Sequence, residues 1–499
     1  MKPSGTGETV SMREIEQKFE VPEDFELPSF DTVLGVAKVS APVEHNLDAI
    51  YYDTPDLRLA ASNLVLRRRA GGDDAGWHLK ESVGDGERLE THAPLGAVGD
   101  GVPEELARLV RSRARRRSLV PIAKLESRRI LHRLVGADDD VLAEVADDHV
   151  TGTALLHPDP AVTSWREVEV ELVDGDRDIL TAAAHRLEDA GAEPARWGSK
   201  LGHALGDIDL APAPVELDHR STAREVVAAH LADQVGRLVS LDPHVRRDDE
   251  DAVHQMRVAT RRLRSALATF RRLVDRAVTE PLRDELKWLG GELGAARDTE
   301  VIHQRLQEMV AAEPPALVHG PVAQRIDTTM SQRYADARSA LLATLDSDRY
   351  LQLLDDLDAV ASGAVIVGDP ADKKATKVLP RDLRRAKRRW QRDVDALDDA
   401  EDTDVQLHEV RKKAKRVRYA GEAVAPALGN KPKKLAARME ELQDVLGRHQ
   451  DGIVTARVLE GLSDEARAAG EDTFTYGRLH AIEQRAAADA AAEGRSRLV

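Results

Sequence analysis

A change of hydrophobic period divides this chain of 499 residues into two halves and constrains its fold more than any other feature. From about residue 12 to residue 205, short segments such as "REIEQKFEV", "LVLRRRA" and "REVEVELV" alternate apolar with charged residues between turn-rich breaks. This alternation is typical of strands that bury one face. After "IDLAPAPVEL", residues 208–217, the segments become long, amphipathic and rich in Ala, Leu, Arg and Glu, which indicates helices.

The two periods predict an α+β multidomain protein. About eight antiparallel strands in the first half indicate a barrel or a strongly curved sheet, with flanking helices near residues 102–112 and 178–190. The second half is expected to be an all-α domain. The expected divisions are a tail at residues 1–11, a strand domain at 12–207, a linker at 208–217 and a helical domain at 218–499.

Composition excludes several classes of protein. The chain has no cysteine, so disulfides, thiol nucleophiles and thiolate metal sites are absent. No stretch approaches the roughly 20 uncharged apolar residues of a membrane helix, and the first residues, "MKPSGTGETVSM", lack the apolar core of a secretory signal. We therefore expect a cytoplasmic protein without a membrane partner. The formal net charge of -17 argues against a general nucleic-acid coat, although 72 Lys and Arg residues can form local basic patches.

Charged residues recur at alternate positions of the predicted strands. Glu14, Glu16 and Lys18 share one strand face. A late strand carries a second row, consisting of Glu167, Glu169 and Glu171. The strands between them contribute the basic residues Arg67, Arg69, Lys80, Arg88 and Arg129. One such row alone is typical of a half-exposed strand, but acidic and basic strands that alternate along the chain favour a polar lumen with the apolar faces outside.

A polar lumen of this composition favours a metal ion together with a phosphate ligand. Carboxylates that are confined together repel one another and take up protons unless a cation shares them. Oxygen ligands favour a hard cation such as Mg²⁺ or Mn²⁺ over zinc. The guanidinium and ammonium groups nearby match the oxygens of a second, strongly anionic ligand.

The same segments resemble a known family. "EIEQKF" matches the ExExK signature of the CYTH family, the triphosphate tunnel metalloenzymes, and residues 12–205 follow the order of that family's motifs. "YYDTPDLRLAASNLVLRRRAGGDDAGWHLK" is similar to its Tyr-Asp-Thr and Leu-Arg-x-Arg region, "REVEVEL" to its late acidic strand and "WGSKLGHAL" to its terminal Ser-Lys segment. The resemblance implies an eight-stranded antiparallel tunnel that hydrolyses or cyclises triphosphate compounds with Mg²⁺ or Mn²⁺.

The resemblance also implies roles for individual residues. The expected metal ligands are Glu14, Glu16, Asp147, Glu167, Glu169 and Glu171. The expected phosphate-binding residues are Lys18, Arg67, Arg69, Lys80, Arg88, Arg129 and Lys200. Lys18 and Lys200 are also the expected catalytic residues. Asp148 remains the alternative to Asp147, and Arg128 the alternative to Arg129. The sequence departs from the family pattern at "LKES", where Lys-x-Pro is common, and at Asn63, where glycine is usual.

An internal repeat organises the helical half. Four residues have offsets of 0, 3, 7 and 10, namely His254, Arg257, Arg261 and Arg264. The same offsets recur 154 residues later at His408, Arg411, Lys415 and Arg418. A Leu-Gly pair followed by an aspartate lies 39 and 38 residues after the two histidines, with the aspartates at Asp298 and Asp451. We expect two similar blocks, at about 218–361 and 373–495, around a pseudo-two-fold axis.

Each repeat carries one narrow basic stripe, because its four offsets fall within about 80° of a helical arc. Further basic residues occur in "PRDLRRAKRRWQR", among them Arg384 and Arg388. Aromatic residues make up only 3% of the chain, so little surface is available to stack bases. A phosphate ligand without bases is therefore favoured. The two histidines suit hydrogen bonds to phosphate better than a metal, because cations surround them.

The helical motifs resemble a second family. "HQMRVATRRLRSAL" and "HEVRKKAKRVRYAGE" are similar to the paired signatures of the CHAD family, the conserved histidine α-helical domain, over about residues 218–495. The resemblance implies two pseudo-symmetric four-helix bundles with a basic groove that binds inorganic polyphosphate. The residues expected to bind it are His254, Arg257, Arg261, Arg264, Arg384, Arg388, His408, Arg411, Lys415 and Arg418.

The combined hypothesis is a CYTH-CHAD protein in which a metal-dependent triphosphatase tunnel is joined to a polyphosphate-binding module. One alternative is a non-catalytic protein that binds or targets polyphosphate. Another is an adenylate cyclase, which the low aromatic content disfavours. The expected partner is inorganic polyphosphate or triphosphate rather than a specific nucleic acid, and association with polyphosphate granules is compatible with this partner. The physiological substrate, the preferred metal and the oligomeric state stay open.

Overall fold

The computed structural model describes residues 10–84, 87–97, 99–156, 161–206 and 216–498. The chain forms two compact units, Met1–Ala213 and Pro214–Val499. Most of the expected tail and linker lies outside the described residues, although the first strand already begins at Val10, within the expected tail. The domain limits chosen from the sequence therefore remain predictions.

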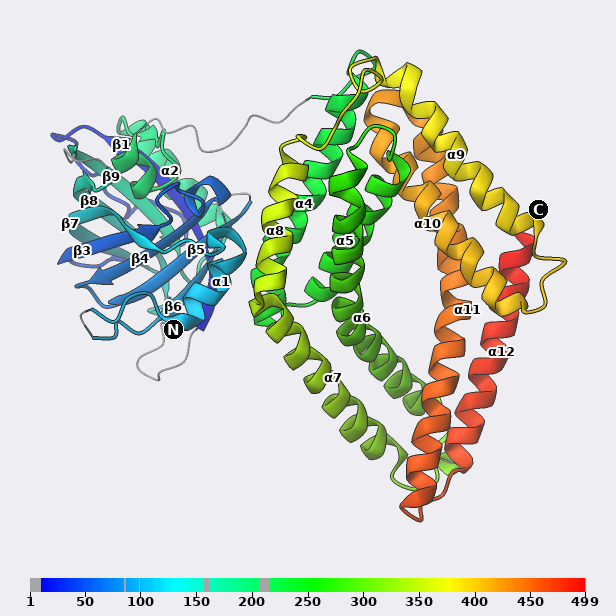
Figure 1. Ribbon diagram of the computed structural model, residues 1–499. Coiled ribbons are helices and arrows are strands. Elements are labelled where there is room, and N and C mark those ends of the chain that lie inside the picture. Colours follow the sequence, from blue (N-terminus) through cyan, green and yellow to red (C-terminus); the bar gives the residue numbers. More distant parts are fainter. Residues whose placement is uncertain (1–9, 85–86, 98, 157–160, 207–215, 499) are drawn as a thin grey trace. The chain divides into compact units, whose positions relative to one another are not determined.

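The first unit is an antiparallel barrel of eight long strands, visible in Figure 1. These strands are β1 (Val10–Val21), β3 (Val43–Asp53), β4 (Leu64–Ala70), β5 (Gly76–Gly84), β6 (Glu87–Ala93), β7 (Val120–Val135), β8 (Val141–Ala154) and β9 (Val162–Leu172). Their order is β1-β6-β5-β4-β3-β7-β8-β9, and β9 pairs with β1 again. Closure depends on β1, which pairs with β6 along its first half and with β9 along its second half. Short strands add to two edges, β2 (Lys38–Val39) on β7 and β10 (Glu193–Pro194) on β1.

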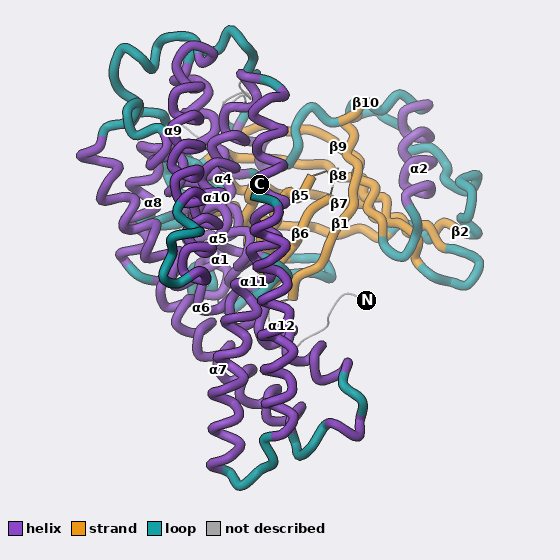
Figure 2. Tube along the Cα trace, turned by 90° about the vertical axis from the view of Figure 1, so that its right-hand side faces the viewer, coloured by secondary structure: helices purple, strands orange, loops and turns teal. Residues whose placement is uncertain are grey.

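Apolar side chains cover the outside of the barrel, as the alternation predicts. Val168 and Val170 of β9 pack under Leu187 of α2 (Arg177–Asp189), which Figure 2 shows beside the strands. A second outer core joins Leu66 and Trp77 to α1 (Glu104–Ala114). Full burial of each such side chain stabilises the fold by about 2 kcal/mol. The charged residues at the alternate positions are thereby directed into the lumen.

A short helix, α3 (Lys200–Leu205), packs into one end of the barrel. Its Leu201 and Ala204 contact residues of the inner strand faces, among them Tyr51, Leu125 and Val150. The helix begins after Ser199, whose hydroxyl accepts a hydrogen bond from the backbone N–H of Gly202 at 3.0 Å. Because the first residue of α3 is Lys200, this apolar contact also places the ammonium of Lys200 inside the barrel.

The Tyr-Asp-Thr motif shapes a turn beside the lumen. Asp53 is buried, and its carboxylate accepts hydrogen bonds from the backbone N–H groups of Thr54, Leu59 and Ala60 at 2.6, 2.9 and 2.9 Å. The chain enters β4 through Asn63, whose φ of 56° lies in the left-handed region. Asparagine adopts this conformation more readily than most residues, so the departure from the usual glycine preserves the turn.

The second unit is all-helical in its described part. Its helices are α4 (Ala223–Arg247), α5 (Ala252–Thr269), α6 (Arg276–Ala312), α7 (Val322–Asp346), α8 (Asp348–Ala361), α9 (Ala375–Asp395), α10 (Thr403–Leu428), α11 (Asn430–Ala468) and α12 (Phe474–Ser496). Helices α4 to α7 begin at residues 223, 252, 276 and 322, and α9 to α12 begin at 375, 403, 430 and 474. The equivalent starts are therefore 151 to 154 residues apart, as the repeat predicts.

The two repeats meet through reciprocal contacts. Thr222 and Lys374, which directly precede α4 and α9, form an antiparallel bridge. The backbone N–H of Ala223 donates to the carbonyl of Lys373, and the backbone N–H of Ala375 donates to the carbonyl of Ser221, both at 2.9 Å. Contacts that exchange equivalent residues are those that a two-fold axis produces. The repeats are thus related by a pseudo-two-fold axis that passes near this bridge.

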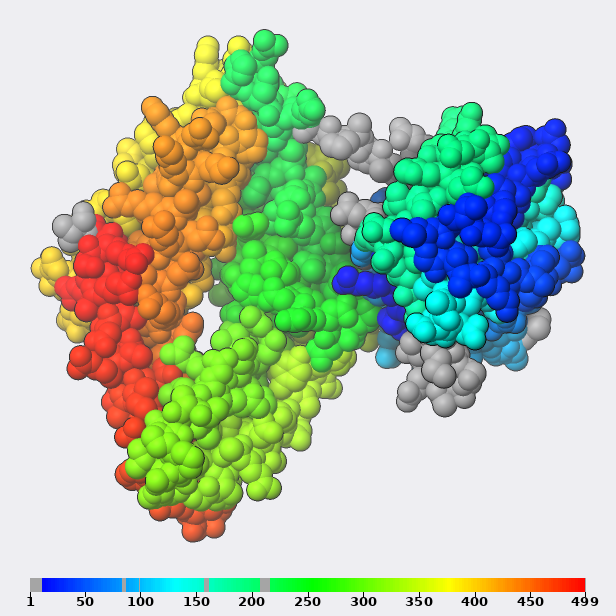
Figure 3. All heavy atoms as spheres, turned by 180° about the vertical axis from the view of Figure 1, so that it is seen from behind, coloured from blue at the N-terminus to red at the C-terminus, as the bar shows by residue number. Residues whose placement is uncertain are grey.

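Three apolar cores hold the helices together. One core lies among α4, α5, α6, α8 and the end of α7 and also includes residues of α9 and α10, and a second lies among α9, α10, α11 and the end of α12. A third joins α6 and α7 to α11 and α12 around Leu306, Met330 and Leu459, at the end of the unit where green and red segments meet in Figure 3. The first core thus crosses from one repeat to the other, and the long helices α6 and α11 join the repeats again at the third core.

Candidate functional site

A cavity of about 350 Å³ occupies the barrel lumen. The expected site residues that line it are Glu14, Glu16, Lys18, Arg67, Arg69, Lys80, Arg88, Arg129, Glu169, Glu171 and Lys200. Glu167 lies beside them, with its Oε1 2.5 Å from the Nζ of Lys200. The alternating charges of separate strands therefore gather around one hollow.

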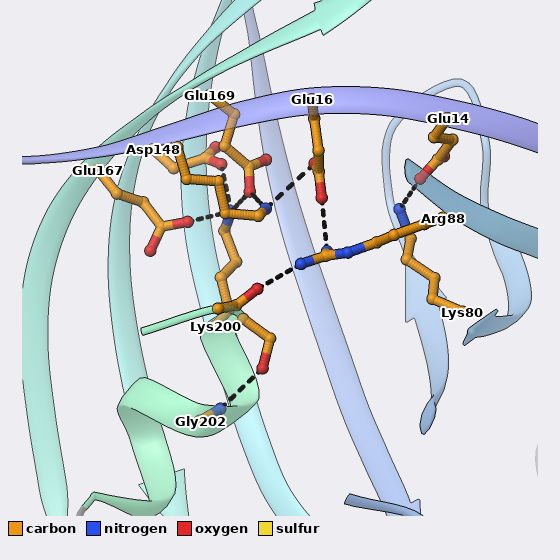
Figure 4. A network of polar contacts seen from close by, with 12 residues as sticks. Glu14, Glu16, Lys80, Arg88, Asp148, Glu167, Glu169, Lys200 and Gly202 are labelled. Carbon is orange, nitrogen blue, oxygen red and sulfur yellow. Dashed lines mark hydrogen bonds and ion pairs between the residues drawn. The ribbon is translucent and has the colours of Figure 1, made fainter. Parts of the chain in front are cut away.

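Three buried carboxylates form the most acidic part of the lumen (Figure 4). Asp148 of β8 and Glu167 and Glu169 of β9 each offer an oxygen, and these oxygens lie within 4.8 Å of one another. We call them the acidic triad. The Nζ of Lys200 lies 3.0 Å from Asp148, 2.5 Å from Glu167 and 2.7 Å from Glu169. An ammonium group thus occupies the centre of the acidic triad and compensates part of its charge.

Arg129 supports the acidic triad from β7. Its guanidinium donates to both carboxylate oxygens of Asp148, at 2.8 and 2.6 Å, and to Glu169 at 2.9 Å. Although burial opposes the effect, Arg129 and Lys200 lower the pKa of Asp148 to about 2. Lys18 and Lys200 likewise hold the pKa of Glu169 below its ordinary range against the effect of burial. Asp148 and Glu169 are therefore ionised and ready to bind a cation.

In each pair of neighbouring candidates, one side chain points into the barrel and the other points out. Asp147, selected from the sequence as a metal ligand, lies on the other face from Asp148 and pairs with Arg166 at 2.9 and 2.8 Å. The structure therefore corrects this choice, because successive strand residues point to opposite sides and Asp148 is the one in the acidic triad. Arg128 points outward and contacts Glu44 at 3.3 Å, whereas Arg129 points inward.

Glu14 and Glu16 lie outside the acidic triad but belong to the same network. The Nζ of Lys80 lies 2.5 Å from Glu14, and Arg88 lies 2.5 Å from Glu16. Lys18 contacts both Glu16, at 3.1 Å, and Glu169 of the acidic triad. Burial raises the pKa of Glu14 to about 8, so this carboxyl is largely protonated at neutral pH. Burial acts in the same direction on Glu16, but Lys18, Lys80 and Arg88 together outweigh it and lower the pKa of Glu16.

Cations crowd the wall formed by β4 and β7. Arg67 is half-buried beside the buried Arg69, and Arg69 contacts Asp74 in the turn before β5. Burial and the guanidinium groups of Arg67 and Arg129 lower the pKa of Arg69. Crowded cations of this kind attract an anion with several negative oxygens. Glu171 lines the same cavity, half-buried, so all three glutamates of the late strand reach the lumen region.

Sequence reasoning missed three lumen residues. Glu90 and His92 follow Arg88 at alternate positions of β6, and His78 precedes Lys80 in the same way on β5. The Nδ1 of His78 lies 2.7 Å from Glu90. Burial lowers the pKa of His78 to about 3, so its imidazole is neutral. The signal was available, since residues two positions from a chosen lumen residue share its face.

The two basic stripes of the helical unit come together. The equivalent helices α5 and α10 contact each other, and Lys415 lies within the electrostatic reach of Arg257, Arg261 and Arg411. Burial and these three guanidinium groups lower the pKa of Lys415 to about 7. We call these four residues the cationic centre. Their mutual repulsion favours an anion that binds between them.

The Leu-Gly motifs make room for two of these arginines. A Cβ atom at Gly294 would lie 3.2 Å from Arg257, and one at Gly447 would lie 3.1 Å from Arg411. Asp298, one turn after Gly294, accepts a hydrogen bond from Arg257 at 2.6 Å. Asp298 therefore orients the guanidinium of Arg257. The motif therefore positions arginines against α6 and α11.

Both histidines of the repeat lie beside cations. Burial lowers the pKa of His254 and of His408, and the charges of neighbouring arginines and Lys412 act in the same direction. The Nδ1 of His408 is buried without a hydrogen-bond partner among the described residues. A neutral imidazole at each position can donate a hydrogen bond to a phosphate oxygen without adding a positive charge.

The basic surface continues from α10 to α9 through Arg416 and Arg389, which sequence reasoning did not select. Arg264 lies near Arg416, and Arg416 lies near Arg389. Arg389 in turn lies near Arg385, which shares its helix face. The selected residues of α9, Arg384 and Arg388, are exposed on another side of the helix. Arg418 pairs with Glu422 at 2.8 Å and with Glu440 at 2.6 Å, so two carboxylates compensate its charge.

The acidic triad fits a hard divalent cation. Mg²⁺ and Mn²⁺ prefer carboxylate oxygens, and the acidic triad offers three of them without a nitrogen or sulfur ligand. The ammonium of Lys200 already shows that a positive charge is favourable at this position. Glu16 adjoins the acidic triad through Lys18, which contacts both Glu16 and Glu169.

Comparisons with known proteins agree with both resemblances. A family model described as CYTH domain matches residues 12–193, and one described as CHAD domain matches residues 229–460. An uncharacterized protein of Mycobacterium tuberculosis, present in two strains, is 39% identical over 482 residues, which cover 94% of this chain and 92% of that protein.

Two solved structures are similar to single units. The CHAD domain from the plant Ricinus communis is 26% identical, with a TM-score of 0.46, over 59% of this chain and 97% of that chain. A protein from Hippeastrum, described as having a dominant triphosphatase activity, is 15% identical, with a TM-score of 0.24, over 40% of this chain and 98% of that chain. Among the helices that the structure describes, none is long and apolar enough to span a membrane.

Proposed function

The chain belongs to the proteins in which a CYTH domain, residues 12–193, precedes a CHAD domain, residues 229–460, and from this premise we propose a function for each unit. The barrel hydrolyses inorganic triphosphate, polyphosphate or another triphosphate compound with Mg²⁺ or Mn²⁺. The helical unit binds inorganic polyphosphate at its cationic centre. CYTH domains characterise the triphosphate tunnel metalloenzymes, and the CHAD domain is linked to polyphosphate.

One observation carries the catalytic proposal: the acidic triad and a wall of cations line the same cavity of about 350 Å³. A cavity with carboxylates alone would suit a metal, and one with cations alone would suit an anion. Both together suit a metal complex of a polyanion, as in phosphoryl transfer. The cavity is too charged for an apolar ligand.

The residues divide the proposed work by position. Asp148, Glu167 and Glu169 would hold the divalent cation, with Glu16 beside them. When bound, the metal would neutralise developing charge on phosphate oxygens and help to activate water. The phosphate groups of the substrate that do not react would be bound by Arg67, Arg69, Lys80 and Arg88. The phosphate group that reacts would be bound by residues nearer the acidic triad.

Lys18 and Lys200 are those nearer residues. Each contacts a carboxylate of the acidic triad and also lines the cavity. Their ammonium groups would exchange a carboxylate partner for a phosphate oxygen when substrate enters, and they would then stabilise the charge that develops during in-line displacement. Arg129 keeps Asp148 and Glu169 in place throughout.

The experiment is a measurement of phosphate release from tripolyphosphate and long-chain polyphosphate, with and without Mg²⁺ or Mn²⁺. We expect metal-dependent release by the full chain. Asp148→Asn and Arg129→Ala should each lower turnover by on the order of 100-fold, because each removes a charge from the site where the transition state is stabilised. Arg128→Ala is the matched control and should retain full turnover, since its side chain lies outside the barrel.

Two outcomes would contradict the catalytic proposal. Release of phosphate that does not depend on Asp148 would place the reaction elsewhere in the chain. Binding of polyphosphate without phosphate release from any triphosphate, at any metal concentration, would favour a protein that only binds its ligand. Formation of cyclic AMP from ATP as the main product would instead indicate a cyclase.

A further inference from the structure

Trp165 contacts the acidic triad through a hydrogen bond from an uncharged donor. Trp165 and Glu167 are two residues apart on β9, so their side chains share the inner face. The indole Nε1–H of Trp165 donates to the Oε2 of Glu167 at 2.6 Å, while the Oε1 of Glu167 lies 2.5 Å from Lys200. Both oxygens of this carboxylate are therefore held, one by the indole and one by the ammonium.

This contact differs from the others made by the acidic triad. Among the described residues, the remaining hydrogen-bond donors to the acidic triad are cationic: Arg129 on Asp148, and Arg129 and Lys18 on Glu169. A cationic donor orients a carboxylate but also competes electrostatically with a bound metal ion. An indole N–H orients the carboxylate without adding a full positive charge. The Oε2 of Glu167 is thus oriented without a second positive charge beside that of Lys200.

The indole ring is fixed in a slot between β8 and α3. A Cβ atom at Gly152 of β8 would lie 3.0 Å from the ring of Trp165 and equally close to Ala204 of α3, so only glycine leaves this space. Trp165 also stacks on the imidazole of His203, with ring centroids 4.1 Å apart and planes at 11°. The position of the ring is therefore set by packing and not by the hydrogen bond alone.

The slot also connects two parts of the site. His203 lies one turn after Lys200 on α3, while Glu167 lies on β9. Trp165 touches both His203 and Glu167, and Lys200 touches Glu167 as well. A displacement of α3 would consequently shift the indole together with the ammonium. The acidic triad and the helix that carries Lys200 are mechanically coupled through this ring.

We propose that Trp165 is a positioning residue that orients Glu167 for divalent-cation binding in the acidic triad. The inference rests on the proposed function, because it assumes that the acidic triad binds a metal. Mutation of a residue that hydrogen-bonds to a metal ligand typically lowers metal affinity by about 10-fold to 100-fold. We expect the loss of one hydrogen bond from an uncharged donor to lower metal affinity by an amount at the lower end of that range.

The test measures Mn²⁺ affinity of the full chain by electron paramagnetic resonance, which detects free Mn²⁺ without any turnover. Trp165→Phe keeps a ring against His203 but removes the N–H, and we expect about 10-fold weaker binding. Trp197→Phe is the matched control. Trp197 also lies near His203, with ring centroids 6.1 Å apart, and this variant should bind Mn²⁺ as the wild type does. Thermal unfolding of both variants checks that the fold is retained.

A double variant separates positioning from general packing. If Trp165 acts through Glu167, then Trp165→Phe should cause no further loss of affinity in a chain that already carries Glu167→Gln. An equal loss in both backgrounds would overturn the inference, and so would wild-type affinity in Trp165→Phe itself. Absence of specific Mn²⁺ binding to the wild type would overturn the proposed metal function first, and the inference with it.

Discussion

Lys415 shows how strongly one residue depends on its neighbours. Lys415 is half-buried within reach of the guanidinium groups of Arg257, Arg261 and Arg411, and Asp451 is the carboxylate that acts on it from α11. Burial and the three cations lower its pKa to about 7. Near neutral pH the lysine is therefore only partly charged in the free protein. A bound phosphate would reverse this, because negative charge favours the ammonium form.

The affinity of the helical unit for polyphosphate should fall as pH rises above about 7. Below this pKa Lys415 is already protonated, whereas above it binding must take up a proton, which weakens affinity by at most about 10-fold per pH unit. The window from about pH 7.5 to 9.5 suits the measurement because the pKa values of His254 and His408 are lowered and both rings stay neutral. Fluorescence anisotropy of a labelled polyphosphate at constant ionic strength gives the slope.

Lys415→Arg is the control for this prediction. An arginine remains protonated throughout the window, so the variant should bind with little dependence on pH. Equal slopes for wild type and variant would show that another group takes up the proton.

At the scale of elements, a glycine on each long helix decides where an arginine lies. Gly447 of α11 leaves space for Arg411, and Gly294 of α6 leaves the equivalent space for Arg257. Glycine in a helix interior costs about 1 kcal/mol relative to alanine. The helices accept this cost at the two positions where the cationic centre meets the backbone.

Gly447→Ala should stabilise α11 yet weaken polyphosphate binding. The new Cβ would lie 3.1 Å from the end of the Arg411 side chain, which is flexible enough to move away. We expect unfolding to become harder by up to about 1 kcal/mol and the affinity to fall by several-fold. Gly461→Ala on the same helix is the matched control, because no atom lies within 4 Å of a Cβ there. Chemical denaturation and anisotropy titration distinguish the two effects, and unchanged affinity in Gly447→Ala would contradict the prediction.

The sequence predicts elements better than it predicts partners. Alternation identified the lumen strands, and the repeat offsets located α5 and α10, because both signals are local and periodic. Asp147 and Asp148 stayed alternatives because a strand changes face at every residue, and only pairing with β9 shows which face is inside. Glu90 was not selected from the sequence. Its contact with His78 depends on the pairing of β5 with β6, which no single segment reveals.

At the scale of the whole molecule, two charged sites of different kinds share one chain. The barrel closes its charges inside a cavity, so it favours a ligand segment of limited size. The cationic centre lies on helices whose basic surface continues to Arg416 and Arg389, so it favours an extended polyanion. A long polyphosphate that is held by one unit is present at a high effective concentration for the other, whatever the arrangement of the units.

Removal of charge from the cationic centre should therefore affect long substrates alone. In the double variant Arg261→Gln and Lys415→Gln, we expect wild-type turnover of tripolyphosphate, because the barrel residues are untouched. For long-chain polyphosphate the KM should rise by about 10-fold or more at low salt, since the effective-concentration advantage is lost. High salt should shrink the difference between variant and wild type, because counterions screen the same charges. Steady-state kinetics on both substrates at two ionic strengths provide the comparison, and an equal rise in KM for tripolyphosphate would show that the helices do not act as a separate binding unit.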